Sequence, residues 1–263
     1  MTILEAPPER STSLKNAVIL GCGRSGTSLV AGSLSDAGYY MGSRLYPGSE
    51  SNPKGYFESD EINRINEDLI AQVDPKRPRF WGRWFFRSRP LAGQRWLSRL
   101  SLGTSMAADA GIRQRIQDVT SKVPFCFKDP RFSYTLPVWR PYLKDAVFVC
   151  VFRDPAETAF SILTECRRVP YLRTLSMNFK TALEVWYLNY RHILDIHRRE
   201  GEWLFVHYHQ MLEREGLERL RQFLGAAVDP SFPDARLNRS RAHALLLPHV
   251  RKTYQELLAL SER

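Results

Sequence analysis

The sequence predicts an α/β protein with a P-loop-like central parallel sheet of about five strands and helices on both faces. Three observations lead to this fold class. Short apolar segments alternate along the chain with segments of helical periodicity. The segment 145–152, DAVFVCVF, is apolar on both faces, as a strand buried in a parallel sheet must be. A glycine-rich turn follows the first apolar segment, where sheets of this kind bind phosphate groups.

Residues 1–15 are polar and interrupted by proline, so we expect a flexible N-terminal arm followed by a single domain over 16–263. After the first strand at 17–20, apolar residues at helical spacing predict a helix that stops near Gly38. The later elements are expected in this order: a helix from Asp60, a helix over 104–121, a strand at 123–127, a helix around 133–143, the strand at 145–152, a helix from Pro155, a long helix over 174–199, a strand at 203–206 and a last helix from about 249.

The chain is basic, with 38 Lys and Arg against 28 Asp and Glu, a net charge of +10. This charge suits an anionic small ligand, a nucleic acid or a membrane surface, and does not choose among them. The sequence has no apolar run long enough for a membrane span and no apolar segment suited to a signal peptide, so we expect a cytoplasmic location. The four cysteines lack metal-ligand spacing and are expected to be reduced core residues.

The segment 75–100 has an unusual composition, with eight basic side chains, six aromatic ones and no acidic ones. Three functional interpretations fit it: an acceptor-binding lid, a nucleic-acid surface or a membrane-facing patch. A purely structural alternative is an inserted helix whose Trp and Phe side chains pack inward while its arginines face water. The composition alone leaves these alternatives open.

The strongest functional signal is the segment 17–28, AVILGCGRSGTS. Gly21, Gly23 and Gly26 keep the turn free of side chains, so backbone N–H groups can close around an anion, and a helix is expected to start at Thr27. The spacing copies the P-loop pattern G-x-x-x-x-G-K-[ST], except that Thr27 stands where the lysine belongs.

Polar residues also follow the other predicted strands: Lys128 and Asp129, Arg153, and Tyr208. The carboxyl ends of parallel strands lie at one edge of the sheet, so we expect these side chains to meet the glycine-rich loop there. The clearest strand ends in Arg153 and not in the aspartate that would hold Mg²⁺ in a P-loop NTPase. This pattern predicts an anionic nucleotide bound without a metal ion.

The segments GCGRSGTS, KDPR and VFRDPAETAFS together resemble the sulfotransferases that use 3′-phosphoadenosine 5′-phosphosulfate (PAPS). In that family an arginine and a serine eight positions later hold the 3′-phosphate, and Arg153 and Ser161 have this spacing, which is about two helical turns. The resemblance also places Tyr208 near the adenine. It implies that the 5′-phosphosulfate is bound by the loop residues Gly23, Arg24, Ser25, Gly26, Thr27 and Ser28.

The R-S-G-T loop and the downstream K-D-P look closer to the tyrosylprotein and carbohydrate sulfotransferases than to the cytosolic enzymes for small phenols. The latter usually have Lys where this chain has Arg24, and they use a histidine base. The resemblance therefore implies a glutamate base, for which Glu58 is our choice and Glu50 and Glu61 are competitors. Arg24 and Lys128 would stabilise charge on the transferring group, and a tail arginine, Arg239 or Arg241, would add a third contact to the 3′-phosphate.

The resemblance thus predicts transfer of a sulfuryl group from PAPS to a hydroxyl or amine, leaving adenosine 3′,5′-bisphosphate and requiring no metal. The acceptor would be a small molecule, sugar, lipid or peptide, and no nucleic-acid partner is expected. An alternative enzyme is a P-loop kinase or related phosphotransferase, which Thr27 and the missing metal aspartate disfavour. A non-enzymatic alternative is a protein that binds nucleic acid or membranes through segment 75–100.

Overall fold

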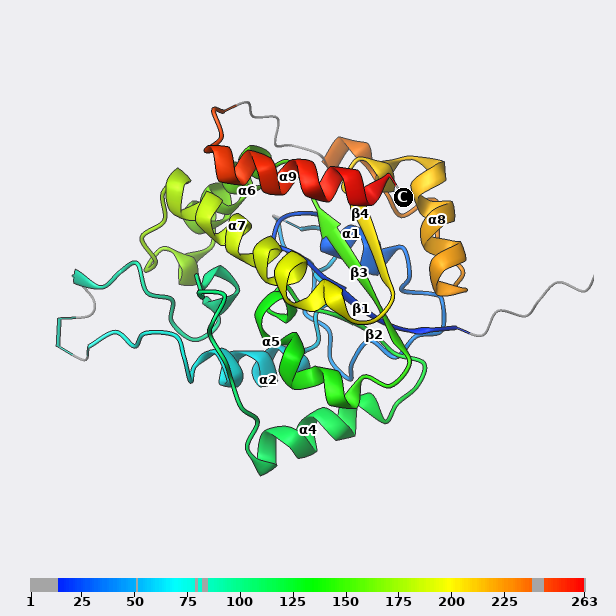
Figure 1. Cartoon of the computed structure of the whole chain (residues 1–263), viewed down its shortest axis with the longest axis horizontal. Helices are drawn as coiled ribbons and strands as arrows, with labels where there is room; N and C mark the ends of the chain where they lie inside the picture. The colour runs from blue at the N-terminus through cyan, green and yellow to red at the C-terminus, as the bar shows by residue number, and fades with distance from the viewer. Residues whose placement is uncertain (1–13, 51, 79, 82–84, 238–243, 263) are drawn as a thin grey trace, which may run out of the picture.

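The structure, a computed structural model, describes residues 14–50, 52–78, 80–81, 85–237 and 244–262. Its central feature is a parallel sheet in the order β2-β1-β3-β4 (Figure 1). The described residues contain four strands where about five were predicted. Their bounds are β1 (Asn16–Leu20), β2 (Cys126–Lys128), β3 (Ala146–Phe152) and β4 (Trp203–His207).

Helices cover both faces of the sheet, as predicted. One face packs against α2, α4, α5, α6, α7 and α9, and the other against α1 and α8. The helices are α1 (Thr27–Gly32), α2 (Asp60–Ile70), α4 (Ala110–Thr120), α5 (Phe132–Trp139), α6 (Pro155–Arg168), α7 (Phe179–Asp195), α8 (Arg214–Leu224) and α9 (Pro248–Ser261). Short 3-10 turns lie at η1 (Arg95–Leu97), η2 (Arg140–Tyr142), η3 (Pro170–Leu172), η4 (His197–Arg199), η5 (Gln210–Leu212) and η6 (Ala235–Leu237).

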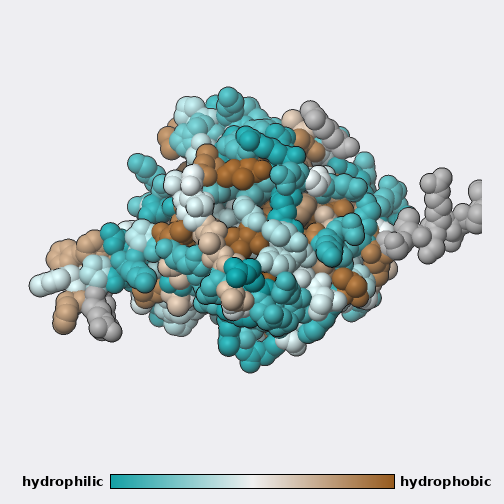
Figure 2. Space-filling view, turned by 60° about the horizontal axis from the view of Figure 1, so that its bottom comes forward, coloured by the Kyte–Doolittle hydropathy of each residue, from teal (hydrophilic) through white to brown (hydrophobic). Residues whose placement is uncertain are grey.

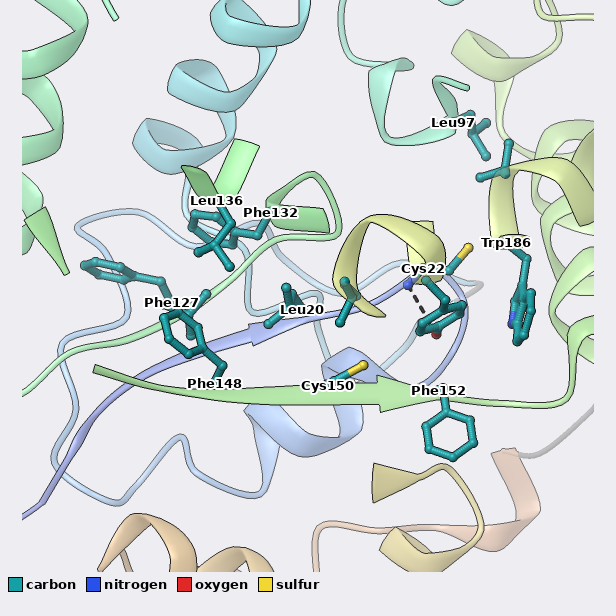
Figure 3. Packing of buried hydrophobic residues seen from close by; sticks show 14 of the residues in the cluster. Leu20, Cys22, Leu97, Phe127, Phe132, Leu136, Phe148, Cys150, Phe152 and Trp186 are labelled. Atoms are coloured by element: carbon teal, nitrogen blue, oxygen red, sulfur yellow. Dashed lines mark hydrogen bonds between the residues drawn. The ribbon is translucent and has the colours of Figure 1, made fainter. Parts of the chain in front are cut away.

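Alternate side chains of the central strands enter the two cores, because successive residues of a strand point to opposite faces. In β3, Phe148, Cys150 and Phe152 join the larger core, whereas Val147 and Val149 join the smaller one. Figure 3 shows part of the larger core, with β1 and β3 side chains packed below those of α5 and α7. The carboxyl ends of β1 and β3 are therefore held from both sides, and the segments that follow them start from a rigid base.

The first helix ends earlier than predicted, at Gly32 and not at Gly38. The chain continues in tighter turns, in which Leu34 N–H donates to Ala31 O at 3.1 Å and Ala37 N–H to Leu34 O at 3.0 Å. A Cβ atom at Gly32 would lie 2.0 Å from the Phe232 ring, so the glycine lets the later chain pack closely on α1. The helices predicted over 104–121 and 174–199 are also shorter, as α4 and α7, while α2 begins at Asp60 as predicted.

The structural alternative for segment 75–100 is wrong for three of its aromatic residues. Phe80, Trp81 and Phe85 do not pack inward but are 89%, 65% and 74% exposed. Trp96, by contrast, packs against the larger core, so its neighbourhood is part of the domain. Most of the expected arm, residues 1–13, lies outside the described residues, and Lys15 is already tied to the domain because its N–H donates to Leu224 O at 3.1 Å.

Among the helices of the described ranges, none is both long and apolar enough to cross a bilayer.

Candidate functional site

A cavity of about 960 Å³ lies at the carboxyl edge of the sheet, between the glycine-rich loop, the segment before α2, and α6. Ten of the predicted site residues line it: Gly23, Arg24, Gly26, Thr27, Ser28, Glu58, Lys128, Arg153, Ser161 and Tyr208. Ser25 does not line it, because its side chain is fully buried and its Oγ lies 3.4 Å from Thr158 Oγ1. The structure thus brings together residues that are as far apart in sequence as Gly23 and Tyr208.

The loop after β1 has a backbone that few residues other than glycine adopt. Gly21 has φ 140°, and a Cβ atom there would lie 2.2 Å from Val151 O. Gly26 has φ 98°, and its Cβ would lie 2.5 Å from the Tyr208 ring. Arg24 also has a positive φ, 70°, a conformation that costs a non-glycine residue about 1–2 kcal/mol. Such turns form concave sets of N–H groups that bind anions, which matters here because α1 has only six residues and a correspondingly small dipole.

Tyr190 of α7 fixes the start of this loop. Its hydroxyl accepts from Cys22 N–H at 3.3 Å and donates to Val151 O at 2.8 Å (Figure 3, dashed line at Cys22). Burial raises the pKa of Tyr190 well above its usual value, so the hydroxyl keeps the proton that it donates. One buried side chain therefore ties the loop to the neighbouring strand.

Lys128, at the end of β2, connects the loop to the segment before α2. Its Nζ donates to Ser28 Oγ at 3.2 Å, to Tyr56 O at 3.1 Å and to Glu58 Oε1 at 2.5 Å. The lysine side chain is 2% exposed and that of Glu58 15%, so water screens this ion pair very little. The ammonium group is held within hydrogen-bond distance of both the loop and a carboxylate.

Glu58 is the one of the three candidate bases that lines the cavity. Its second carboxylate oxygen, Oε2, accepts from Asn63 Nδ2 at 2.9 Å, so both oxygens have a partner and the group has one orientation. Glu61 points elsewhere: Tyr40 OH donates to it at 2.6 Å and Ser43 Oγ at 3.1 Å. Glu50 is also absent from the cavity lining.

Arg153 and Ser161 lie on one side of the cavity. Asp154 caps α6 by accepting from two backbone N–H groups, which starts the helix directly after Arg153 and carries Ser161 about two turns along it. The Arg153 guanidinium lies 4.6 Å from the centre of the Tyr208 ring, and its Nε donates to Glu157 at 2.8 Å. Arg24 Nε donates to Ser161 Oγ at 3.2 Å. A guanidinium from the residue after β3, a hydroxyl from α6 and an aromatic ring after β4 thus come together.

The cavity contains further residues that the sequence analysis did not select. Glu165 Oε2 lies 3.7 Å from Arg24 Nη1, and Tyr56 OH donates to Glu165 Oε1 at 3.4 Å. The spacing of Glu165, one turn after Ser161, was a signal that could have found it. Trp96 lies against the loop, because a Cβ at Gly23 would fall 2.5 Å from its ring, and nothing in the local sequence indicates this contact.

The acidic residue that follows Lys128 has a different role. Asp129 is 1% exposed and accepts from Arg131 at 3.1 Å and from Asn66 at 3.1 Å. Arg131 in turn contacts Glu67 at 2.8 Å, and Glu67 contacts Arg95 at 2.7 Å. Burial raises the pKa of Asp129, which the Arg131 charge opposes. This chain of ion pairs fixes the KDPR segment, of which Lys128, Pro130 and Arg131 line the cavity.

The described residues contain no group of three or more His, Cys, Asp or Glu side chains that could hold a metal ion. All four cysteines are free and buried. Arg239 and Arg241, the candidates for a third phosphate contact, lie outside the described residues.

Comparison with known proteins gives one family and several similar folds. Residues 17–230 match the model of the family described as the sulfotransferase family. No curated protein sequence matches the chain significantly. A similar solved structure is the sulfotransferase domain from the curacin biosynthetic pathway, with 13% identity, a TM-score of 0.55 and coverage of 93% of this chain and 98% of that one.

Two further structures are less similar. The sulfotransferase domain of the olefin synthase from Synechococcus PCC 7002 has 15% identity, a TM-score of 0.48 and coverage of 95% and 98%. Sulfotransferase STF9 from Mycobacterium avium has 16% identity, a TM-score of 0.46 and coverage of 94% and 68%. The family match spans most of the chain, including the loop, both KDPR and VFRDP segments, and Tyr208, and the chain therefore belongs to the sulfotransferase family.

Proposed function

We propose that this chain transfers the sulfuryl group of PAPS to a hydroxyl or amine of an acceptor, with Glu58 as the base. The observation that carries this proposal is the position of Lys128, whose Nζ lies 3.2 Å from Oγ of Ser28, in the first turn of α1 directly after the loop, and 2.5 Å from Glu58 Oε1. The Lys128 ammonium group thus contacts both the proposed base and the start of the helix that follows the donor-binding loop, and all of them line one cavity. The resemblance of the R-S-G-T loop and the K-D-P segment to the tyrosylprotein and carbohydrate sulfotransferases also implies a glutamate base.

The residues present fit the donor. The loop offers its backbone N–H groups around Gly26 to a 5′-phosphosulfate, and the positive φ of Arg24 shapes this turn. Arg153 and Ser161 supply a guanidinium and a hydroxyl on the same side of the cavity for a 3′-phosphate. The Tyr208 ring, already in contact with the Arg153 guanidinium, offers an apolar face to the adenine.

PAPS, when bound, supplies an activated sulfuryl group and leaves as adenosine 3′,5′-bisphosphate. Glu58, as a carboxylate, takes the proton from the acceptor hydroxyl or amine as the new bond to sulfur forms. Arg24 and Lys128 stabilise the negative charge that grows on the sulfuryl oxygens and on the bridging phosphate oxygen. Asn63 and Lys128 orient the Glu58 carboxylate for this task.

The test is a transfer assay with radiolabelled PAPS and an extract of candidate acceptors, followed by the same assay with Glu58→Gln. The wild-type protein should label at least one acceptor, and Glu58→Gln should lower turnover by about 10²–10⁴-fold, the usual contribution of a general base. Glu61→Gln is the matched control, because Glu61 bonds Tyr40 and Ser43 and does not line the cavity. Equal turnover of the Glu58 variant and the wild type would remove Glu58 from the mechanism, and no labelled product from any fraction would contradict the proposed activity.

A further inference from the structure

A buried carboxylate lies in the wall of the cavity that we expect to bind an anionic donor. Hydrophilic side chains cover much of the surface in view in Figure 2, and charged side chains are rarely buried in proteins. Four charged side chains of the cavity lining are nevertheless buried: Lys128, Arg131, Arg153 and Glu165. Glu165 is the acidic member of this set and is 5% exposed. Its charge repels the phosphate and sulfate groups of the donor, so on its own it weakens donor binding.

Glu165 and Ser161 contact the same guanidinium group. Glu165 lies one helical turn after Ser161, on the face of α6 that lines the cavity. Its Oε2 lies 3.7 Å from Arg24 Nη1, and Arg24 Nε donates to Ser161 Oγ at 3.2 Å. Because a guanidinium group is planar and rigid, contacts at two of its nitrogen atoms determine how it is oriented.

The other carboxylate oxygen of Glu165 is connected to Lys128 through Tyr56. Tyr56 OH donates to Glu165 Oε1 at 3.4 Å, and the backbone O of Tyr56 accepts from Lys128 Nζ at 3.1 Å and from Ser28 Oγ at 3.2 Å. Both oxygens of Glu165 therefore have a contact that fixes them. Arg24 and Lys128, the two cations assigned to the transferring group, are joined through Glu165 and Tyr56.

Arg24 lies between two anion sites of the proposed donor complex. The loop around Gly26 would bind the 5′-phosphosulfate, and Ser161, which Arg24 already contacts, would bind the 3′-phosphate. A guanidinium group in this position is attracted to both anions, and a contact with the 3′-phosphate would turn it away from the sulfuryl group. The Glu165 carboxylate gives Arg24 a third anionic partner, which is held by the protein itself.

We propose that Glu165 is a positioning residue that directs Arg24 at the sulfuryl group and keeps it away from the 3′-phosphate. This inference rests on the proposed sulfuryl transfer. Two consequences of opposite sign follow from it. Glu165 makes transfer faster, because Arg24 meets the sulfuryl oxygens in the right geometry. It also makes the bisphosphate product bind more weakly, because it repels the phosphates and occupies Arg24.

Glu165→Gln, which keeps the size of the side chain and removes its charge, measures both consequences. In calorimetric titration, adenosine 3′,5′-bisphosphate should bind this variant at least about threefold more tightly than the wild type. Transfer of label from PAPS to an extract fraction that the wild type labels should have a kcat at least about tenfold lower, with no rise in the KM for PAPS. A merely structural role would instead weaken bisphosphate binding.

Two conservative variants separate the charge of Glu165 from its hydrogen bond. Tyr56→Phe removes the hydroxyl that contacts Glu165 and keeps the backbone O that accepts from Lys128. It should change both quantities in the same direction as Glu165→Gln, by a smaller factor. Glu165→Asp keeps the negative charge, so its affinity for the bisphosphate should return to within about twofold of the wild type.

Asp74→Asn is the matched control. Asp74 is also buried, lies 3.8 Å from Arg95 and does not line the cavity. Burial raises the pKa of Asp74 to about 6, so the assays are run at pH 8, where this carboxylate is charged. The control should leave the bisphosphate affinity and the transfer rate unchanged, and thermal melting checks that every variant is folded.

Equal or weaker bisphosphate binding by Glu165→Gln would overturn the proposal, as would transfer at the wild-type rate. If Glu165→Gln does not fold, Tyr56→Phe decides on the same two readouts. If the wild type labels no fraction, the proposed function is contradicted. The titration still tests Glu165 in that case, because tighter bisphosphate binding by Glu165→Gln, and not by Asp74→Asn, would show that Glu165 acts on the anion site.

Discussion

Lys128 and Glu58 should be strongly coupled, and a double-mutant cycle with Lys128→Met and Glu58→Gln measures the coupling. Their side chains are 2% and 15% exposed and lie 2.5 Å apart. Removing one partner of a buried ion pair leaves the other charge without compensation, which costs about 3–5 kcal/mol. We expect Lys128→Met to lose about 3 kcal/mol in the free energy of unfolding and Glu58→Gln slightly less, because Lys128 keeps Ser28 Oγ and Tyr56 O as partners.

The double variant leaves neither charge buried alone. Its loss should therefore be smaller than the sum of the two single losses, by about 2 kcal/mol. Urea unfolding at neutral pH gives the four free energies, and thermal melting checks them, since 3 kcal/mol corresponds to about 6–12 °C in a domain of this size. Single effects that add to within about 0.5 kcal/mol would refute the reasoning, because they would mean that water screens the pair.

Two other predictions concern Gly26 in the glycine-rich loop and the buried histidine His197. Gly26→Ala should weaken bisphosphate binding in a calorimetric titration, because the φ of 98° is strained for alanine and its Cβ would meet the Tyr208 ring at 2.5 Å. Gly38→Ala controls for the φ alone, because Gly38 has φ 89°, its Cβ would have no neighbour closer than 3.9 Å, and it does not line the cavity. Burial lowers the pKa of His197 to about 4, whereas in the unfolded chain this imidazole has its ordinary pKa of about 6.5. Between these two values the unfolded chain binds a proton at His197 that the folded chain does not bind. Acidification from about pH 7 to about pH 5 should therefore lower the free energy of unfolding by roughly 2 kcal/mol. His197→Gln should lose less stability over this range in urea titrations, and an equal loss would contradict the assignment.

Much of the fold could be predicted because the relevant signals are local. The apolar residues of 145–152 indicated a strand buried on both faces, and β3 occupies Ala146–Phe152. The start of α6 followed from Pro155, a proline at the first helical position, and the structure adds that Asp154 caps the helix. Element ends were predicted less well. Gly32, the last residue of α1, packs against Phe232, a residue about two hundred positions away, and no local pattern contains that contact.

The candidate site likewise contains some residues that a sequence pattern could indicate and others that it could not. Arg153 and Ser161 were selected because their spacing of eight matches the arginine and serine of the family that the chain resembles, and the structure places both at the cavity, with Ser161 on α6 and Arg153 just before it. Glu58 could be named only with two competitors, because its pairing with Lys128 joins residues 70 positions apart. The structural alternative for segment 75–100 predicted that its Trp and Phe side chains pack inward, and this is wrong for Phe80, Trp81 and Phe85, which are exposed. Composition shows that these side chains are apolar, but it does not show whether they lie close enough to a hydrophobic core to pack against it.

The most direct test of the proposed donor site is calorimetric titration with adenosine 3′,5′-bisphosphate in the presence of a chelator. We expect the bisphosphate to bind without magnesium, and adenosine 5′-monophosphate, which lacks the 3′-phosphate, to bind at least about tenfold more weakly. Arg153→Gln should abolish that difference, whereas Lys144→Gln, an exposed change away from the cavity, should preserve it. Equal affinity for the two nucleotides, or binding of ATP alone when magnesium replaces the chelator, would contradict a site for the 3′-phosphate that needs no metal.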